Sequence, residues 1–178
     1  IMKEDGTGIK ALTNYTAGAN QPVWSPDGSK IAFISSKDGT NDIYVMDNDG
    51  TNVRRLSNDA TMEYGVSWRS DSKSIIFDKT SIGIASINID GSNYYVIPNS
   101  SGCTYPTFSP DDNFIYSQYN SGGWHIFKMP SNDGISMQNL TSSQTGNACG
   151  NVILSPDGSE MYYAQNISSN YQIFRWID

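Results

Sequence analysis

The fold of this chain is decided by the stretch Val23-Trp24-Ser25-Pro26-Asp27-Gly28-Ser29-Lys30-Ile31, because related stretches return three more times. The copies begin at Ser67, Thr107 and Ile153, and each has an apolar anchor followed by a turn that contains Ser and Asp. The four anchors recur after 44, 40 and 46 residues and are Trp24, Trp68, Phe108 and Leu154. Trp24 and Trp68 are both expected to be buried between neighbouring units. A period in the forties, with about four short strands in each unit, is typical of a β-propeller blade.

Each unit divides into four strands at its turn signals. Ser-Pro-Asp-Gly suits the first turn, because Pro fixes φ, Asp bonds the nearby backbone and Gly accepts a positive φ. First strands are predicted over 21–25, 65–69, 105–109 and 151–155. Second strands are predicted over 30–35, 74–79, 114–119 and 160–165, and third strands over 42–47, 83–88, 124–129 and 171–176. Outer, fourth strands are predicted over 9–13, 52–57, 93–98 and 136–141.

The whole chain is therefore expected to be all-β. We predict one propeller domain or propeller segment over 1–178, with about four blades of four antiparallel strands. The expected blade limits are about 20–57, 64–98, 104–141 and 150–178. Such a chain would be part of a larger propeller or of an oligomeric one.

Composition narrows the classes of function. The 178 residues are 37% hydrophobic and have a formal net charge of −7. That charge argues against a nucleic-acid partner, because phosphate binding needs clustered Lys and Arg. No run of about 18 apolar residues occurs, so we expect no membrane insertion by a helix. One His and two Cys are too few for the usual zinc sites, and we expect neither a metal nor a cofactor.

The first unit resembles the TolB-type propeller repeat. The resemblance rests on Trp24–Phe33, on Asp42–Asp47, on the Asp-Gly-Thr turn at 49–51 and on Arg-Leu-Ser at 55–57. Such repeats occur in periplasmic envelope proteins, in the propellers of prolyl-oligopeptidase-like serine peptidases and in oligogalacturonate-lyase-like enzymes. The resemblance therefore implies a propeller fold, and it implies a periplasmic or extracellular location, but it does not choose one function.

Two copies depart from the Ser-Pro-Asp-Gly turn. The third has Asp112 in place of Gly, and the second has Ser70 and Ser72 in place of Pro and Gly. The Asp of each turn is expected to be structural, since a catalytic role repeated four times is implausible. Those residues are Asp27, Asp71, Asp111 and Asp157.

The first and last strands of the chain are expected to be complementary. The strand predicted at 9–13 is an outer strand, and the last unit is predicted to lack one. Propellers avoid open sheet edges and usually complete one blade from both ends. Three arrangements stay open: a larger propeller of six to eight blades, a ring of eight blades built by two copies, or one chain closed as four blades. We therefore expect self-association through the terminal blades or pairing of 9–13 with 171–176.

No catalytic residue can be identified. No Gly-x-Ser-x-Gly elbow occurs, and His125 has no His or Cys near it in the sequence. The run Asp47–Asn52 begins like a calcium loop, but its Gly comes too early and no closing Glu follows. A hairpin turn is the better interpretation of that run.

Binding is expected on the face that carries the longer connections, which run from fourth to first strands and from second to third strands. We call this the loop face. Aromatic and amide side chains there suit stacking and hydrogen bonding to a sugar or a peptide. The candidates for ligand binding are Asn20, Glu63, Tyr64, Tyr105, Trp124, Asn147 and Asn151. Tyr105 ranks first, because it comes at the start of a first strand, beside the central channel.

The two cysteines occupy equivalent places in consecutive units. Cys103 and Cys149 each lie five residues before an apolar anchor. They could form a disulfide if their Cα atoms came within about 4.4–6.8 Å, which would indicate an oxidising compartment. Two free thiols are the alternative.

These observations favour a non-catalytic binding or scaffold module that recognises a protein or glycan, in the bacterial envelope or outside the cell. The alternative is the substrate-gating propeller of a prolyl-oligopeptidase-like serine peptidase whose catalytic domain lies outside this chain. A lyase comes third, because a manganese site of that kind needs several His and this chain has one.

Overall fold

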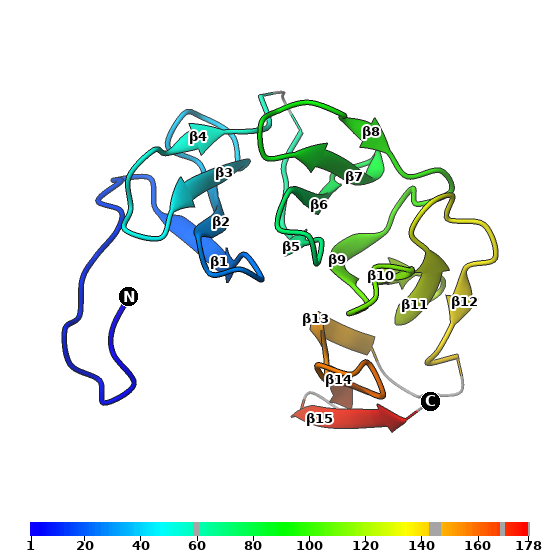
Figure 1. Ribbon diagram of the computed structural model, residues 1–178. Coiled ribbons are helices and arrows are strands. Elements are labelled where there is room, and N and C mark those ends of the chain that lie inside the picture. Colours follow the sequence, from blue (N-terminus) through cyan, green and yellow to red (C-terminus); the bar gives the residue numbers. More distant parts are fainter. Residues whose placement is uncertain (59–60, 143–146, 168–169, 178) are drawn as a thin grey trace.

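The computed structural model describes residues 1–58, 61–142, 147–167 and 170–177, and it describes only the backbone of 147–151. The secondary structure of the described residues is entirely β, as predicted, with fifteen strands in four antiparallel sheets. The sheets follow one another along the chain as the blades of an arc (Figure 1). Within the described ranges, no helix is long and apolar enough to cross a membrane.

Each blade contains strands that are consecutive in the chain. Blade 1 contains β1 (Ala19–Trp24), β2 (Lys30–Ser35), β3 (Asp42–Asp47) and β4 (Arg54–Arg55). Blade 2 contains β5 (Val66–Trp68), β6 (Ser74–Lys79), β7 (Gly83–Asn88) and β8 (Tyr95–Val96). Blade 3 contains β9 (Thr104–Phe108), β10 (Phe114–Asn120), β11 (Trp124–Pro130) and β12 (Gln138–Asn139). Blade 4 contains β13 (Asn147–Leu154), β14 (Glu160–Ile167) and β15 (Asn170–Ile177).

The second and third strands lie where the repeat predicts them, to within two residues at each end. The outer strands β4, β8 and β12 are shorter than predicted, with two residues each. The prediction of a strand at 9–13 is wrong, because these residues form no strand. They do not pair with β15 but lie against blade 1, where Leu12 packs on buried side chains.

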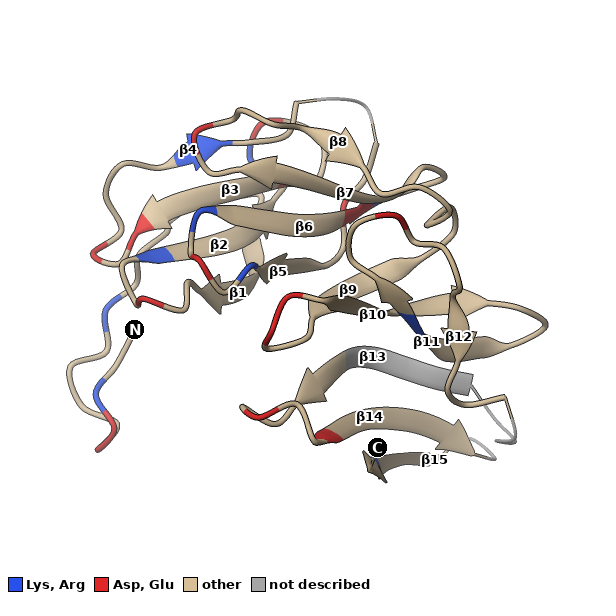
Figure 2. Cartoon of the chain, turned by 45° about the vertical axis from the view of Figure 1, so that its right-hand side comes forward, with Lys and Arg blue, Asp and Glu red and all other residues tan. Residues whose placement is uncertain are grey.

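The turns between first and second strands keep one geometry despite the sequence departures. In the first turn Asp27 accepts hydrogen bonds from the Ser25 hydroxyl (2.7 Å) and the Ser29 amide (3.0 Å), which confirms its structural role. The position of the turn Gly has a positive φ in all four blades, namely 69° at Gly28, 59° at Ser72, 61° at Asp112 and 75° at Gly158. Figure 2 shows acidic residues at several of these hairpin turns.

The core lies between blades rather than within them. Because side chains alternate along a strand, each blade has a rear face toward the preceding blade and a front face toward the following one. At the first junction the front face of blade 1, with Ala32 and Ile43, packs on the rear face of blade 2, with Ile75 and Phe77. Equivalent clusters join blade 2 to blade 3 and blade 3 to blade 4.

The two Trp anchors differ, although the repeat predicts that both are buried. Trp68 is 6% exposed on the rear face of blade 2, and its Nε1 donates to the Val23 carbonyl of blade 1 at 3.0 Å. Trp24 is 50% exposed, so its predicted burial is wrong. The reason is that, among the described residues, no blade precedes blade 1, and only Leu12 and Tyr15 pack on its rear face.

Candidate functional site

On the loop face, the connection into blade 2 lies between blades 1 and 3. The connection that enters blade 2 is held by hydrogen bonds on both sides. The Glu63 amide donates to the Asn41 carbonyl (3.3 Å) in blade 1, and the Thr80 hydroxyl donates to the Met62 carbonyl (2.8 Å) in blade 2. The short segment 61–65 is therefore fixed by its neighbours and can present side chains in a set geometry.

Tyr64 and Tyr105, predicted from different repeats, are brought together around Asp78 in β6. Asp78 is 1% exposed, and its Oδ1 accepts the Gly65 amide at 2.5 Å. The backbone amides of Tyr64 and Tyr105 also face this carboxylate. Gly65 is required here, because a Cβ at this position would lie 2.7 Å from the Tyr105 Cα. We call Tyr64, Asp78 and Tyr105, with Met62 beside them, the tyrosine cluster.

Burial dominates the electrostatics of this cluster. It raises the pKa of Asp78 from 3.8 to about 6, although the surrounding backbone amides act in the opposite direction. Burial also raises the pKa of the Tyr105 hydroxyl, with smaller contributions from Asp78 and Tyr64. Within the described residues Asp78 Oδ2 has no hydrogen-bond partner. Sequence reasoning missed Asp78, and the signal that could have found it is a carboxylate directly after the apolar run Ile75–Phe77, within a predicted second strand.

The exposed part of the tyrosine cluster consists of Met62, which is 49% exposed, and Tyr64, which is 37% exposed. The Tyr64 hydroxyl lies 3.3 Å from the Met62 sulfur. Tyr105 is half-buried and has a φ of 51°, in the left-handed region. A bulge interrupts the pairing of β9 at this point, and β1 and β13 carry bulges at the equivalent place. The bulge is thus a repeated feature of the fold that sets the direction of the side chain beside the channel.

Glu63 does not belong to the exposed site that the sequence predicts. It is fully buried, and its Oε2 accepts the Ser57 hydroxyl at 2.7 Å. Close by, Asp42 is also fully buried and forms a 2.7 Å ion pair with Arg55. These groups join the third and outer strands of blade 1 to the connection that follows, so Glu63 has a structural role.

The other candidates lie apart from the tyrosine cluster or outside the described side chains. Trp124 begins β11 at the loop-face end of blade 3 and is 36% exposed. Asn20 is exposed at the start of β1, beside the open rear face of blade 1. The side chains of Asn147 and Asn151 lie outside the described residues, and so does that of Cys149. Cys103 is buried, and its sulfur lies 3.8 Å from that of Met137. The predicted disulfide between Cys103 and Cys149 falls outside the described side chains.

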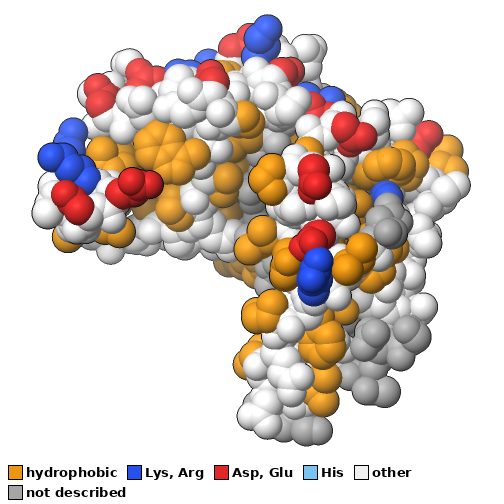
Figure 3. Space-filling view, turned by 60° about the horizontal axis from the view of Figure 1, so that its bottom comes forward, with side chains coloured by type: hydrophobic (Ala, Val, Ile, Leu, Met, Phe, Trp, Pro, Cys, Tyr) orange, Lys and Arg blue, Asp and Glu red, His pale blue; other side chains and the backbone are white. Residues whose placement is uncertain are grey.

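The face opposite the loop face carries a hollow at the centre of the arc. Its volume is about 560 Å³, and strands β1, β5, β9 and β13 with their following turns line it. The wall is mostly apolar and hydroxyl-bearing, and includes Val66, Thr107 and Leu154, with Pro26 and Pro110 at the turns. Figure 3 shows hydrophobic side chains along both arms of the arc, around its opening. The repeat pattern did not predict this hollow.

The remaining chemistry-bearing residues have structural partners. His125 Nδ1 lies 3.2 Å from the Thr141 carbonyl. The run Asp47–Asn52 forms the predicted hairpin turn, in which the Asp47 amide donates to the Thr51 carbonyl at 2.9 Å. In the part of the chain that the structure describes, no group of three or more His, Cys, Asp or Glu side chains could hold a metal ion.

Comparison with known proteins agrees with the repeat. A model of the family described as TolB beta propeller domain matches residues 1–149. TolB from Acinetobacter baumannii superposes with a TM-score of 0.86 at 22% identity, over 99% of this chain and 45% of that one. A putative TolB from Agrobacterium tumefaciens gives a TM-score of 0.76 at 20% identity, over 89% of this chain and 61% of that one. This chain thus spans about half to three fifths of their length.

A third similar structure is an enzyme. A mutant of puromycin hydrolase complexed with PGG superposes with a TM-score of 0.74 at 12% identity. The match covers 97% of this chain but only 30% of the hydrolase. At these identities the three structures establish a common fold and do not establish a common function.

Proposed function

The chain belongs to the TolB beta propeller domain family, and on that premise we propose that it is a non-catalytic module that binds a protein on its loop face. The observation that carries the proposal is the tyrosine cluster, in which residues of two repeats form one fixed surface beside the central channel. Tyr64 and Met62 are its exposed members, and Tyr and Met are enriched at protein interfaces. A rigid backbone under these side chains lowers the entropic cost of binding.

A protein ligand fits this surface better than a glycan does. The two acidic side chains nearest to Tyr64 in this cluster, Asp78 and Glu63, are both buried and are not presented to a ligand. A sugar is recognised through many hydrogen bonds to its hydroxyls, whereas a Tyr and Met pair offers mainly apolar contact. A glycan ligand is therefore an outcome of the test rather than a second proposal. The proposal also places the protein in the bacterial periplasm or outside the cell, as envelope proteins with this repeat suggest.

A gating propeller of a serine peptidase is the second candidate. It is supported by the likeness to puromycin hydrolase, of which this chain covers 30%. In that case the propeller would limit access to a catalytic domain outside this chain. It would then have no ligand of its own on the tyrosine cluster, which separates the two candidates.

The test is a peptide array and a glycan array probed with the wild-type protein, followed by calorimetry with the best peptide. Tyr64→Ala should weaken binding at least tenfold and leave the melting temperature nearly unchanged, since Tyr64 is 37% exposed. Tyr94→Ala is the matched control, because Tyr94 is a 48% exposed Tyr near the outer strand of blade 2. Peptide binding that Tyr64→Ala leaves intact, or binding to glycans alone, would contradict the proposal.

A further inference from the structure

A polar cavity of about 600 Å³ lies in blade 2 on the side of the short turns, away from the tyrosine cluster. The turn from β5 to β6, the start of β6, the end of β7 and the start of β8 line it. Blades 1 and 3 both pack on blade 2, so the cavity has its neighbouring blades within this chain. Its volume is in the range of about 300–1,000 Å³ that is typical of small-molecule sites.

Short side chains open this cavity. The first cross-strand pair of the second and third strands is Lys30 with Asp47 in blade 1, and these two residues form an ion pair of 2.6 Å. The equivalent pair in blade 2 is Ser74 with Asn88. The space that an ion pair fills in blade 1 is therefore open in blade 2.

The floor of the cavity carries hydroxyl groups that no other described residue uses. Ser86, which is 3% exposed, takes the place of Val45 in blade 1, and Ser74 on the same face of the sheet is 7% exposed. Among the described residues, neither hydroxyl takes part in a hydrogen bond. Because a buried polar group without a partner is costly, a ligand that bonds to these hydroxyls is stabilised by them.

The turn of blade 2 places one charge of each sign on the wall of the cavity. Ser25 of blade 1 is replaced by Arg69, whose Cζ atom lies 4.8 Å from the centre of the Phe108 ring in blade 3. Within the described ranges the Arg69 guanidinium has no hydrogen-bond or ion-pair partner. Asp71 thereby lacks the hydroxyl donor that binds its equivalent in each of the other three blades.

Two exposed rings form the rim of the cavity. Tyr94 is 48% exposed and Tyr95 is 41% exposed. Tyr95 lies opposite Ser86 and takes the place of Arg54 in blade 1, which is bonded to a carbonyl of the following blade. The cavity thus combines aromatic rings, hydroxyls, an amide and two opposite charges.

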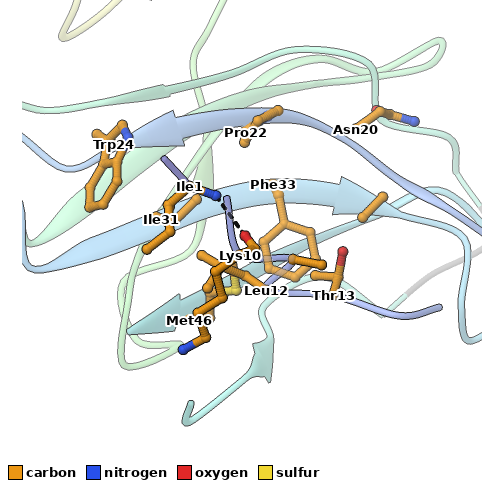
Figure 4. A pocket seen from close by; sticks show the side chains of 12 residues that line it. Ile1, Lys10, Leu12, Thr13, Asn20, Pro22, Trp24, Ile31, Phe33 and Met46 are labelled. Carbon is orange, nitrogen blue, oxygen red and sulfur yellow. Dashed lines mark hydrogen bonds between the residues drawn. The ribbon is translucent and has the colours of Figure 1, made fainter. Parts of the chain in front are cut away.

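The pocket beside the first strands of blade 1 has a different chemistry (Figure 4). Its volume is about 350 Å³, and apolar side chains such as Ile31 and Phe33 form much of its wall. The hydrogen bond drawn there, from the Ile1 amino group to the Lys10 carbonyl at 2.8 Å, joins two parts of the chain itself. That pocket belongs to the packing of the N-terminal residues on blade 1, whereas the cavity of blade 2 presents unpaired polar groups.

We propose that the cavity of blade 2 binds a neutral saccharide. A sugar has hydroxyl groups that both donate and accept hydrogen bonds, and its ring has an apolar C–H face. Ser74 and Ser86 would bond to the sugar hydroxyls, and so would the Arg69 guanidinium. The exposed ring of Tyr95 would pack on the C–H face.

The charge of the site favours a neutral ligand over an anionic one. Arg69 and Asp71 balance each other on the wall, and the chain has a formal net charge of −7. A ligand without charge needs no counter-ion from this site. The inference goes beyond the proposed function, because it concerns the opposite side of the molecule and does not depend on Tyr64.

The first test combines a glycan array with a variant that fills the cavity. The array carries neutral oligosaccharides, with maltotriose, cellotriose and chitotriose among them, and acidic ones for comparison, and calorimetry then measures the best neutral probe. Ser74→Lys combined with Asn88→Asp introduces the ion pair of blade 1, so it should weaken binding at least tenfold with the melting temperature nearly unchanged. Tyr64→Ala is the matched control on the loop face and should bind like the wild type.

The second test concerns the ring at the rim. Tyr95→Ala should weaken binding at least tenfold, whereas Tyr95→Phe should keep most of the affinity because the face of the ring remains. No binding to a neutral oligosaccharide, stronger binding to acidic ones, or an affinity that the filled cavity leaves intact would overturn the proposal. Ser74, Asn88 and Tyr95 all lie outside the tyrosine cluster, so failure here is distinct from failure of the loop-face proposal.

Discussion

Ser70 and Asp112, which depart from the Ser-Pro-Asp-Gly turn in adjacent blades, are hydrogen-bonded to each other. The Asp112 carboxylate accepts the Ser70 amide at 3.0 Å and the Ser70 hydroxyl at 2.6 Å. A Pro at position 70 would have no amide hydrogen to donate. The loss of Pro in one blade and the loss of Gly in the next are therefore coupled by one contact between blades.

This coupling predicts a non-additive mutant cycle. Ser70→Pro should lower the free energy of unfolding by about 1 kcal/mol in the wild type, because it removes a bond to a carboxylate. In the Asp112→Gly background the same change should cost little, since the acceptor is gone and Gly suits the φ of 61°. Denaturant titration of the four proteins measures the coupling. Equal effects of Ser70→Pro in both backgrounds would show that the contact contributes nothing.

The two Trp anchors provide a matched pair for the packing of blades. Trp68→Ala should lower the free energy of unfolding by about 3–5 kcal/mol, because it opens a cavity at the junction of blades 1 and 2. Trp24→Ala should cost less than about 1 kcal/mol when the chain is monomeric, because Trp24 is half exposed. The measurement is a urea titration at a concentration where sedimentation shows monomer. A similar loss for both variants would contradict the position of blade 1 at the open end of the arc.

The raised pKa of Asp78 predicts how the free energy of unfolding depends on pH. Its pKa is about 6 in the folded chain against 3.8 as the ordinary value, so between these pH values the folded state binds more protons. The contribution of this group to stability therefore falls as the pH rises from about 4 to about 6.5, by up to about 3 kcal/mol. Asp78→Asn should remove that fall, so its unfolding free energy relative to the wild type should rise across this range.

Asp157→Asn is the control with the opposite sign. Hydrogen bonds from Ser155 and Ser159 lower the pKa of Asp157 to about 2. This group therefore stabilises the fold above its ordinary pKa, and the stabilisation is lost as the pH falls toward 2. Parallel pH profiles of the wild type and the Asp78→Asn variant between pH 4 and 6.5 would contradict the raised pKa of the buried Asp78 carboxyl.

The strands could be predicted from the sequence because the repeat fixes both their spacing and their buried sides. β2, β3, β6 and β7 have the predicted limits, since strong turn residues bound each of them. The exposure of Trp24 and the burial of Glu63 could not be predicted, because both depend on which neighbours surround the residue in space. The repeat predicts that a Trp anchor packs against a preceding blade, but it does not predict whether such a blade is present. Asp78 was not predicted as a site residue, because the equivalent position in blade 1 holds the apolar residue Ile34.

The sequence predicted two residues of the tyrosine cluster as ligand-binding candidates, because the repeat also fixes where the connections between strands lie. Tyr64 and Tyr105 lie where the repeat places the connections into first strands, and propeller geometry brings those connections together. Their meeting around a buried carboxylate depends on Gly65 and on the bulge in β9, which are local details of backbone. The hollow on the opposite face arises from residues of all four blades and has no local signature in the sequence.

The most direct test of the loop-face proposal is hydrogen–deuterium exchange of the protein with and without the peptide selected on the array. Binding at the tyrosine cluster should slow exchange in the segments 62–65 and 103–107, which enter blades 2 and 3. The turns at 25–29 and 109–112, which border the hollow on the other face, should be unaffected. Protection confined to those turns, with no change at 62–65, would contradict the account.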